Sequence, residues 1–169
     1  MRDVCDIFWD VVKDMEIESL LDVGTGMTGV VGLHLWETKG IKRKYALDIH
    51  KIRDMPPDWI LLIMDARQMS EKFQPKSLDV IQACDFIEHL SKEDGLKWLK
   101  DCEKIARKAI LIFTPIGFKP NILDEELYPD NPHQKHLSGW TQEEFEDLGF
   151  KTTRWGDTHL IAWKVLAQS

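Results

Sequence analysis

Short apolar runs separated by helical stretches constrain the fold of this chain more than any other feature of its sequence. Five such runs occupy the first two thirds of the chain, and none alternates strictly between polar and apolar residues. Strands that are apolar on both faces and are joined by helices are typical of a parallel sheet covered on both sides. The predicted strands are residues 19–23, 44–49, 59–64, 78–84 and 109–113.

Apolar stripes and end signals predict the intervening helices. Residues 4–15 place apolar side chains on one face, and residues 28–36 precede Gly40, which tolerates the positive φ of a helix end. The strongest pattern begins at Ser91, a suitable N-cap, and ends with basic residues as far as Lys108, as the helix dipole favours. Its apolar stripe consists of Leu96, Leu99, Cys102 and Ile105.

The C-terminal part departs from the parallel pattern. Residues 141–148 open with a capping box, Thr141 to Glu144, and predict a short helix. Residues 150–155 and 159–166 have the pattern of two strands joined by a Gly-Asp turn. We therefore predict an α/β fold in which a mostly parallel sheet ends in an antiparallel hairpin.

Size and composition predict a single domain spanning residues 1–169. Hydrophobic residues make up 43% and charged residues 30%, the balance of a folded globular protein. The three cysteines have no CxxC spacing. This predicts a reducing compartment, no disulfide framework and no metal site.

Net charge bears on partners and location. The chain has 22 basic and 29 acidic residues, a net charge of −7 and a pI of about 5.4. Because nucleic-acid-binding proteins need basic surface to neutralise phosphates, this argues against a nucleic-acid partner. The sequence contains no secretory signal and no apolar run that could span a membrane. We therefore expect a cytoplasmic protein without membrane contact.

A glycine-rich loop follows the first predicted strand and marks a candidate ligand site. Gly24, Gly26 and Gly29 would let the backbone approach a ligand closely, and the start of the next helix favours an anionic group. Asp48 ends the second predicted strand, where a carboxylate can bind both hydroxyls of a ribose. The pattern predicts a nucleoside-containing cofactor.

Two cofactor classes compete for this loop. The GxGxxG pattern binds dinucleotides such as NAD, whereas S-adenosylmethionine presents an ammonium beside a carboxylate. Asp22, just before Gly24, would repel a pyrophosphate and attract an ammonium, and so it favours S-adenosylmethionine. The same aspartate could instead merely cap the following turn.

Five segments of the chain carry a combined pattern: LLDVGTGMTG, YALDIH, IMDA, LDVIQACDFIEHL and AILIFTP. Together they resemble motifs one to five of the class I S-adenosylmethionine-dependent methyltransferases, in particular the small, type 11-like members. The resemblance extends from Ser19 to the C-terminus. It implies a three-layer Rossmann-like sandwich with a seven-stranded sheet whose last strand is antiparallel. The loop departs from the more usual GxGxG, since Met27 and Thr28 precede Gly29.

The resemblance also implies roles for matching residues. Asp22 and the glycines would hold the methionine portion, Asp48 the ribose, and Asp65 the adenine amino group. Ile49 could line the adenine or belong to the core. The residues expected to bind the cofactor are Asp22, Gly24, Thr25, Gly26, Asp48, Ile49, Asp65, Ala66 and Cys84.

Methyl transfer requires an acceptor aligned with the sulfonium methyl, and a base only where the acceptor loses a proton. The candidates for this base are Asp85, Glu88, His89, His133 and His136, and of these Asp85, His89 and His136 are the predicted catalytic residues. Asp85 and His89 are four positions apart, so one helical turn would place them on the same side. Each histidine could equally be a surface or loop-anchoring residue.

The long segment 115–140 is the expected acceptor site, because it follows the fifth predicted strand and shows no clear period. Few residues precede the first strand, so the site would be open or completed by a partner chain or a second copy. The side chains expected to contact an acceptor are Tyr128, His133, His136 and Trp140.

Three functions remain open from the sequence. The first is an S-adenosylmethionine-dependent methyltransferase acting on a small-molecule acceptor by in-line displacement. The second is an NAD(P)-dependent Rossmann oxidoreductase, which Asp22 and the absence of a Tyr-x-x-x-Lys pair weaken. The third is a non-catalytic S-adenosylmethionine-binding protein of the same fold.

Overall fold

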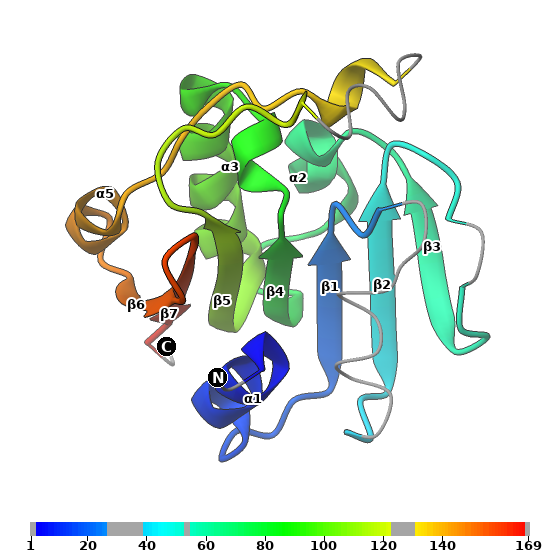
Figure 1. The fold of residues 1–169 in the computed structure, drawn as a ribbon. Coiled ribbons are helices and arrows are strands. Elements are labelled where there is room, and N and C mark those ends of the chain that lie inside the picture. Colours follow the sequence, from blue (N-terminus) through cyan, green and yellow to red (C-terminus); the bar gives the residue numbers. More distant parts are fainter. Residues whose placement is uncertain (1–2, 27–38, 53–54, 123–130, 168–169) are drawn as a thin grey trace.

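A seven-stranded sheet forms the centre of the computed structural model, which describes residues 3–26, 39–52, 55–122 and 131–167 (Figure 1). The strand order is β3-β2-β1-β4-β5-β7-β6. Strands β1 to β5 pair in parallel, and β7 runs antiparallel to both β5 and β6, as predicted. The strands are β1 (Ser19–Val23), β2 (Arg43–Asp48), β3 (Trp59–Ile63), β4 (Leu78–Cys84), β5 (Ala106–Pro115), β6 (Lys151–Trp155) and β7 (His159–Val165).

Helices cover both faces of this sheet. Because neighbouring side chains of a strand point to opposite faces, Leu20 and Leu21 of β1 enter two separate hydrophobic cores. Leu20 packs on the side of α1, and Leu21 on the side of α3 and α5. None of the helices within the described ranges combines the length and apolar character that crossing a membrane requires. The helical elements are α1 (Val4–Val12), η2 (Ala66–Gln68), α2 (Met69–Lys72), η3 (Ile87–His89), α3 (Lys92–Ile105), η4 (Pro132–Gln134) and α5 (Gln142–Asp147).

The predicted N-terminal capping signals of α3 and α5 are present in the structure. Ser91 caps α3 by accepting a hydrogen bond from the Asp94 amide, and the capping box at the start of α5 is present. Gly40 has the expected positive φ, +69°. The predicted helix 28–36 lies outside the described residues.

The predicted end of α3 was wrong, and its predicted apolar stripe was incomplete. The helix ends at Ile105 and continues directly into β5, so the basic residues Arg107 and Lys108 belong to the strand. Ala106 already has an extended backbone and pairs with Leu78 of β4. The predicted stripe also omitted Trp98, which is 1% exposed and packs edge-on against Phe86.

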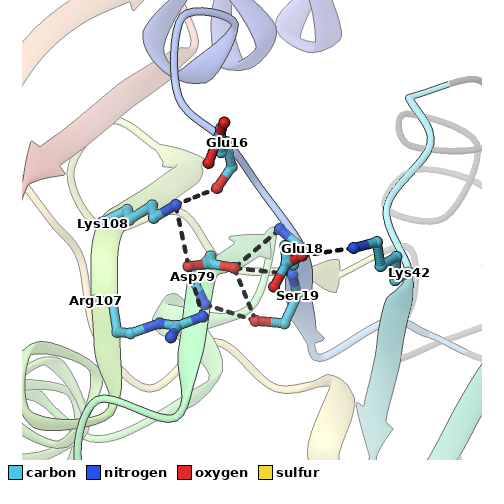
Figure 2. A network of polar contacts seen from close by, with 7 residues as sticks. All are labelled: Glu16, Glu18, Ser19, Lys42, Asp79, Arg107 and Lys108. Atoms are coloured by element: carbon cyan, nitrogen blue, oxygen red, sulfur yellow. Dashed lines mark hydrogen bonds and ion pairs between the residues drawn. The ribbon is translucent and has the colours of Figure 1, made fainter.

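A buried carboxylate joins the amino ends of β1 and β4 (Figure 2). Oδ2 of Asp79 accepts hydrogen bonds from the backbone amides of Glu18 and Ser19 and from Ser19 Oγ, at 2.9–3.1 Å. Arg107 Nη2 lies 2.9 Å from Asp79 Oδ1, and Lys108 Nζ lies 3.5 Å from it. Burial opposes ionisation, but these contacts outweigh it and lower the pKa of Asp79. The network stabilises the sheet at the amino ends of β1 and β4, which lie opposite the carboxyl ends of these strands.

Candidate functional site

A pocket of about 370 Å³ opens at the carboxyl ends of β1 to β4. In parallel sheets ligands bind at the carboxyl ends of the strands, which the arrowheads of β1, β2 and β4 mark in Figure 1. Asp22, Thr25, Cys84 and His136 do not line it. The predicted site residues in its lining are Gly24, Gly26, Asp48, Ile49, Asp65, Ala66, Asp85 and His89.

The glycine loop passes close to Phe86 at the end of β4. Gly24 and Gly26 have positive φ values of +69° and +77°, which residues other than glycine rarely adopt. A Cβ on Gly24 would lie 2.3 Å from Cδ2 of Phe86, whereas a Cβ on Gly26 would meet no atom of the described residues within 4 Å. Gly24 is therefore required by close packing, and Gly26 leaves open space beside the pocket.

Asp48 holds this loop against the end of β2. Its Oδ2 accepts a hydrogen bond of 2.8 Å from the Gly26 amide, and its Oδ1 accepts one of 2.8 Å from the His50 amide. The residue is 8% exposed and lines the pocket. Because each carboxylate oxygen has two lone pairs, Asp48 retains capacity to accept hydrogen bonds from ligand hydroxyls.

Asp22 lies beneath the loop as a buried acid. It is 1% exposed, and its Oδ1 accepts a hydrogen bond of 2.8 Å from Nε2 of Gln82. Its Oδ2 is buried without a hydrogen-bond partner among the described residues. Burial, together with the nearby charge of Asp48, raises the pKa of Asp22 to about 6. Gln82 of the neighbouring strand β4 and the side chain of Thr25 in the following turn both act to lower this pKa, but burial outweighs them.

Asp65, the residue expected at the adenine, is paired with an arginine that the sequence analysis missed. Nε of Arg67 lies 3.0 Å from both carboxylate oxygens of Asp65, and Nη2 lies 2.5 Å from Oδ2. The hydrogen bonds from Arg67 lower the pKa of Asp65. Arg67 also reaches Asp94 at 3.3 Å and lines the pocket. The spacing of this arginine, two residues after the acid, is the sequence signal that could have identified the pair.

The remaining predicted cofactor residues divide between pocket and core. Ile49 is 37% exposed and lines the pocket, which excludes the core alternative, and Ala66 lines it as well. Thr25 donates a hydrogen bond of 3.2 Å from Oγ1 to the carbonyl of Asp22. Cys84 packs in the core on the α1 side, where burial raises the pKa of its thiol well above the usual value.

Asp85 and His89 both line the pocket, but they do not share a helical turn. Asp85 has a left-handed backbone, φ +47°, and only a short 3₁₀ turn follows it, closed by a hydrogen bond from the His89 amide to Phe86. Desolvation raises the pKa of Asp85 to about 6, although 46% of its side chain is exposed. Its Oδ1 lies 3.6 Å from Nε2 of His159 on β7, a neighbour that sequence spacing could not reveal.

Glu88, His89 and His136 form a second cluster beside the pocket. The rings of His89 and His136 meet edge to face with centroids 4.7 Å apart. Glu88 is 1% exposed, and its Oε2 accepts a hydrogen bond of 2.8 Å from Thr114 Oγ1. Burial and the charge of Asp85 raise the pKa of Glu88 to about 8.

The predicted acceptor segment contributes to the pocket only in part. His133 lines it and packs against His50, with ring centroids 5.6 Å apart. Trp140 is fully buried in the core, where it packs on Phe145, so its predicted contact with an acceptor was wrong. Tyr128 lies outside the described residues.

No protein-family model and no curated protein matches the chain. Solved structures, in contrast, do match the chain. A SAM dependent methyltransferase from Archaeoglobus fulgidus is 23% identical with a TM-score of 0.63, over 86% of this chain and 66% of that one. Magnesium protoporphyrin IX methyltransferase from Synechocystis, solved with bound SAH, is 13% identical with a TM-score of 0.61, over 97% and 82%.

A third similar structure is a methyltransferase complex. It contains the Haloferax volcanii Trm112 methyltransferase activator; the match is 17% identical with a TM-score of 0.62, over 97% of this chain and 92% of that one. The chain therefore has the Rossmann-like fold of the class I S-adenosylmethionine-dependent methyltransferases.

Proposed function

We propose that this protein is an S-adenosylmethionine-dependent methyltransferase that acts on a small-molecule acceptor. The observation that carries the proposal is the unpartnered oxygen of Asp22 beneath the glycine loop. A buried carboxylate oxygen without a partner costs free energy, and a bound cation relieves that cost. The ammonium of S-adenosylmethionine is such a cation, and the residues present therefore fit this cofactor.

Residues that line the pocket, together with Asp22 beneath the glycine loop, each bind a part of the cofactor. Asp22 binds the ammonium, and the loop at Gly24 and Gly26 leaves room for the methionine portion. Asp48 accepts hydrogen bonds from the ribose hydroxyls, and Asp65 lies where the adenine is expected. The cofactor supplies a methyl group already activated on a sulfonium, and S-adenosylhomocysteine is the product.

The acceptor binds on the side of the pocket formed by Asp85 and His89. Their role is to orient the attacking atom in line with the methyl, since alignment supplies most of the rate enhancement in such a displacement. Asp85 is placed to accept a proton from the acceptor, because its raised pKa of about 6 brings it near neutral pH. His136 lies behind His89 and positions its ring.

The two other candidate functions use the same pocket. A dinucleotide would bring its pyrophosphate toward the buried acid Asp22, which disfavours the NAD(P)-dependent oxidoreductase. A non-catalytic S-adenosylmethionine-binding protein differs only in lacking methyl transfer. A partner chain or a second copy would complete the acceptor site, and the solved complex with an activator is a precedent among proteins of this fold.

Thermal unfolding with S-adenosylmethionine, S-adenosylhomocysteine and NADH in separate samples tests the cofactor. We expect both adenosyl ligands to stabilise the protein, by about 2.7 kcal/mol at one hundred times the dissociation constant. Asp48→Asn should abolish this stabilisation, whereas Asp157→Asn, an exposed acid in the β6–β7 turn, should retain it. Stabilisation by NADH alone would refute the proposal.

Transfer of a labelled methyl group to a panel of small hydroxyl, amine and thiol compounds tests the activity. Release of S-adenosylhomocysteine that depends on the acceptor is the expected result. Binding of both adenosyl ligands without transfer to any acceptor would favour the non-catalytic function.

A further inference from the structure

Three potential metal ligands meet beside the pocket, although they come from two distant parts of the chain. Glu88 and His89 lie in η3 after β4, and His136 follows η4. One ligating atom from each of them lies within 4.8 Å of the others. Donors about 2.1 Å from a common ion are at most about 4.2 Å apart, so small side-chain rotations would close the site.

Both imidazoles are held in the form that metal ligation requires. Nδ1 of His89 lies 3.3 Å from the carbonyl oxygen of Lys135, and Nδ1 of His136 lies 2.6 Å from that of Lys119. Because a carbonyl oxygen can only accept a hydrogen bond, each Nδ1 carries the proton and each ring lone pair is on Nε2. Metal-ligating histidines commonly donate their second ring nitrogen to a carbonyl in this way.

Glu88 supplies a buried carboxylate whose bonding is incomplete. One oxygen accepts the hydrogen bond from Thr114, whereas Oε1 has no hydrogen-bond partner within the described ranges. Groups this deeply buried normally have all their polar atoms paired, so the unpartnered oxygen points to a missing ligand.

The backbone keeps the two segments together. The carbonyl oxygen of Glu88 accepts hydrogen bonds from the amides of Leu137 (2.8 Å) and Ser138 (3.0 Å). These bonds place His136, the residue before Leu137, beside η3. The cluster is therefore held by the fold and does not depend on a chance meeting of surface side chains.

We propose that Glu88, His89 and His136 bind a divalent first-row transition-metal ion such as Zn²⁺ or Mn²⁺. Two imidazole nitrogens and one carboxylate are the donor set of open transition-metal sites, whereas Mg²⁺ and Ca²⁺ prefer oxygen ligands throughout. Three protein ligands leave further coordination positions for an exogenous group. The prediction of no metal site considered cysteine spacing, which cannot detect a cluster assembled by tertiary contacts.

The ion would lie next to the pocket, because His89 also lines it. An oxygen or nitrogen atom of the acceptor would occupy an open coordination position and be oriented toward the methyl group. This second part rests on the proposed methyltransferase function, whereas metal binding itself does not.

Calorimetric titration of the full chain, freed of metal with a chelator, tests the site without cofactor. We expect one equivalent of Zn²⁺ to bind, and Mg²⁺ to bind at least about tenfold more weakly. His136→Ala and Glu88→Gln should each weaken Zn²⁺ binding by about tenfold or more. His133→Ala is the matched control, because His133 lies on the same segment but contacts His50, and it should bind Zn²⁺ as the wild type does.

Each result decides the proposal. The proposal is overturned if the wild type binds less than one equivalent of Zn²⁺, or if His136→Ala binds Zn²⁺ as tightly as the wild type. It is also overturned if His133→Ala loses as much zinc affinity as His136→Ala does. His136 is only partly buried, so its variant remains informative even if Glu88→Gln fails to fold. Thermal shifts with S-adenosylmethionine in the same preparations separate the two proposals, since loss of cofactor binding leaves the zinc result intact.

Discussion

Gln82 of β4 donates a hydrogen bond of 2.8 Å to the buried carboxylate of Asp22, the residue directly opposite it on β1. The pairing register of two parallel strands thus places an amide against one oxygen of the acid and leaves the other oxygen for a ligand. Gln82 is a positioning residue for the cofactor site, and only the strand register identifies it.

Asp22→Asn should stabilise the ligand-free protein at neutral pH. Burial raises the pKa of Asp22 from 3.8 to about 6, so the native protein holds this proton more tightly than the unfolded chain does. Wild-type stability should therefore fall relative to the variant as the pH rises from about 4 to about 6, by up to about 3 kcal/mol, and the difference should then stay constant. Urea unfolding of both proteins across this range measures the effect.

The same substitution should weaken S-adenosylmethionine binding by about tenfold or more, because the ammonium loses its counter-charge. Wild-type affinity should also fall below about pH 6, as Asp22 becomes protonated. Calorimetric titration at several pH values measures both effects. An unchanged affinity in Asp22→Asn would contradict the assigned role.

Gly24→Ala should cost more stability than Gly26→Ala. Both positions have positive φ, which costs an alanine about 1 kcal/mol, but only a Cβ at Gly24 collides with Phe86. The collision brings the expected cost of Gly24→Ala to about 3 kcal/mol. Urea midpoints of the two variants provide the comparison, and equal costs would show that Phe86 can move away.

Asp85→Asn should lower the methyl-transfer rate by about a hundredfold while leaving cofactor affinity within about threefold. Asparagine adopts the left-handed backbone of this position, φ +47°, so the fold should persist. Single-turnover rates with saturating cofactor measure the effect, and Asp157→Asn serves as the control. A rate close to that of the wild type would exclude Asp85 as the base.

Asp79→Asn should destabilise the protein by about 2 kcal/mol without changing cofactor affinity. The substitution removes the charge that pairs with Arg107 and Lys108 at the amino edge of the sheet (Figure 2). The pocket lies at the opposite edge. Urea unfolding and a binding titration test the two halves of this prediction, and a weakened affinity would reveal coupling across the sheet.

The strands could be predicted because their apolar character is local. β1 and β4 have the predicted bounds, and β2 and β3 differ by a residue or two, since a strand buried on both faces shows as a short apolar run. The end of α3 could not be predicted in this way. Basic residues such as Arg107 suit a helix end, yet Ala106 pairs with Leu78 of β4, and β5 begins there.

The fold class, the glycine loop and the acids at the strand ends could be predicted from the sequence, because they depend on residues adjacent in the chain. The contacts between distant side chains could be seen only in the folded chain. It joined Gln82 to Asp22, placed His159 beside Asp85, and buried Trp140 in the core. It also brought His136 to Glu88 and His89. These distances are set by strand register and by loop hydrogen bonds, and neither of them leaves a periodic pattern along the chain.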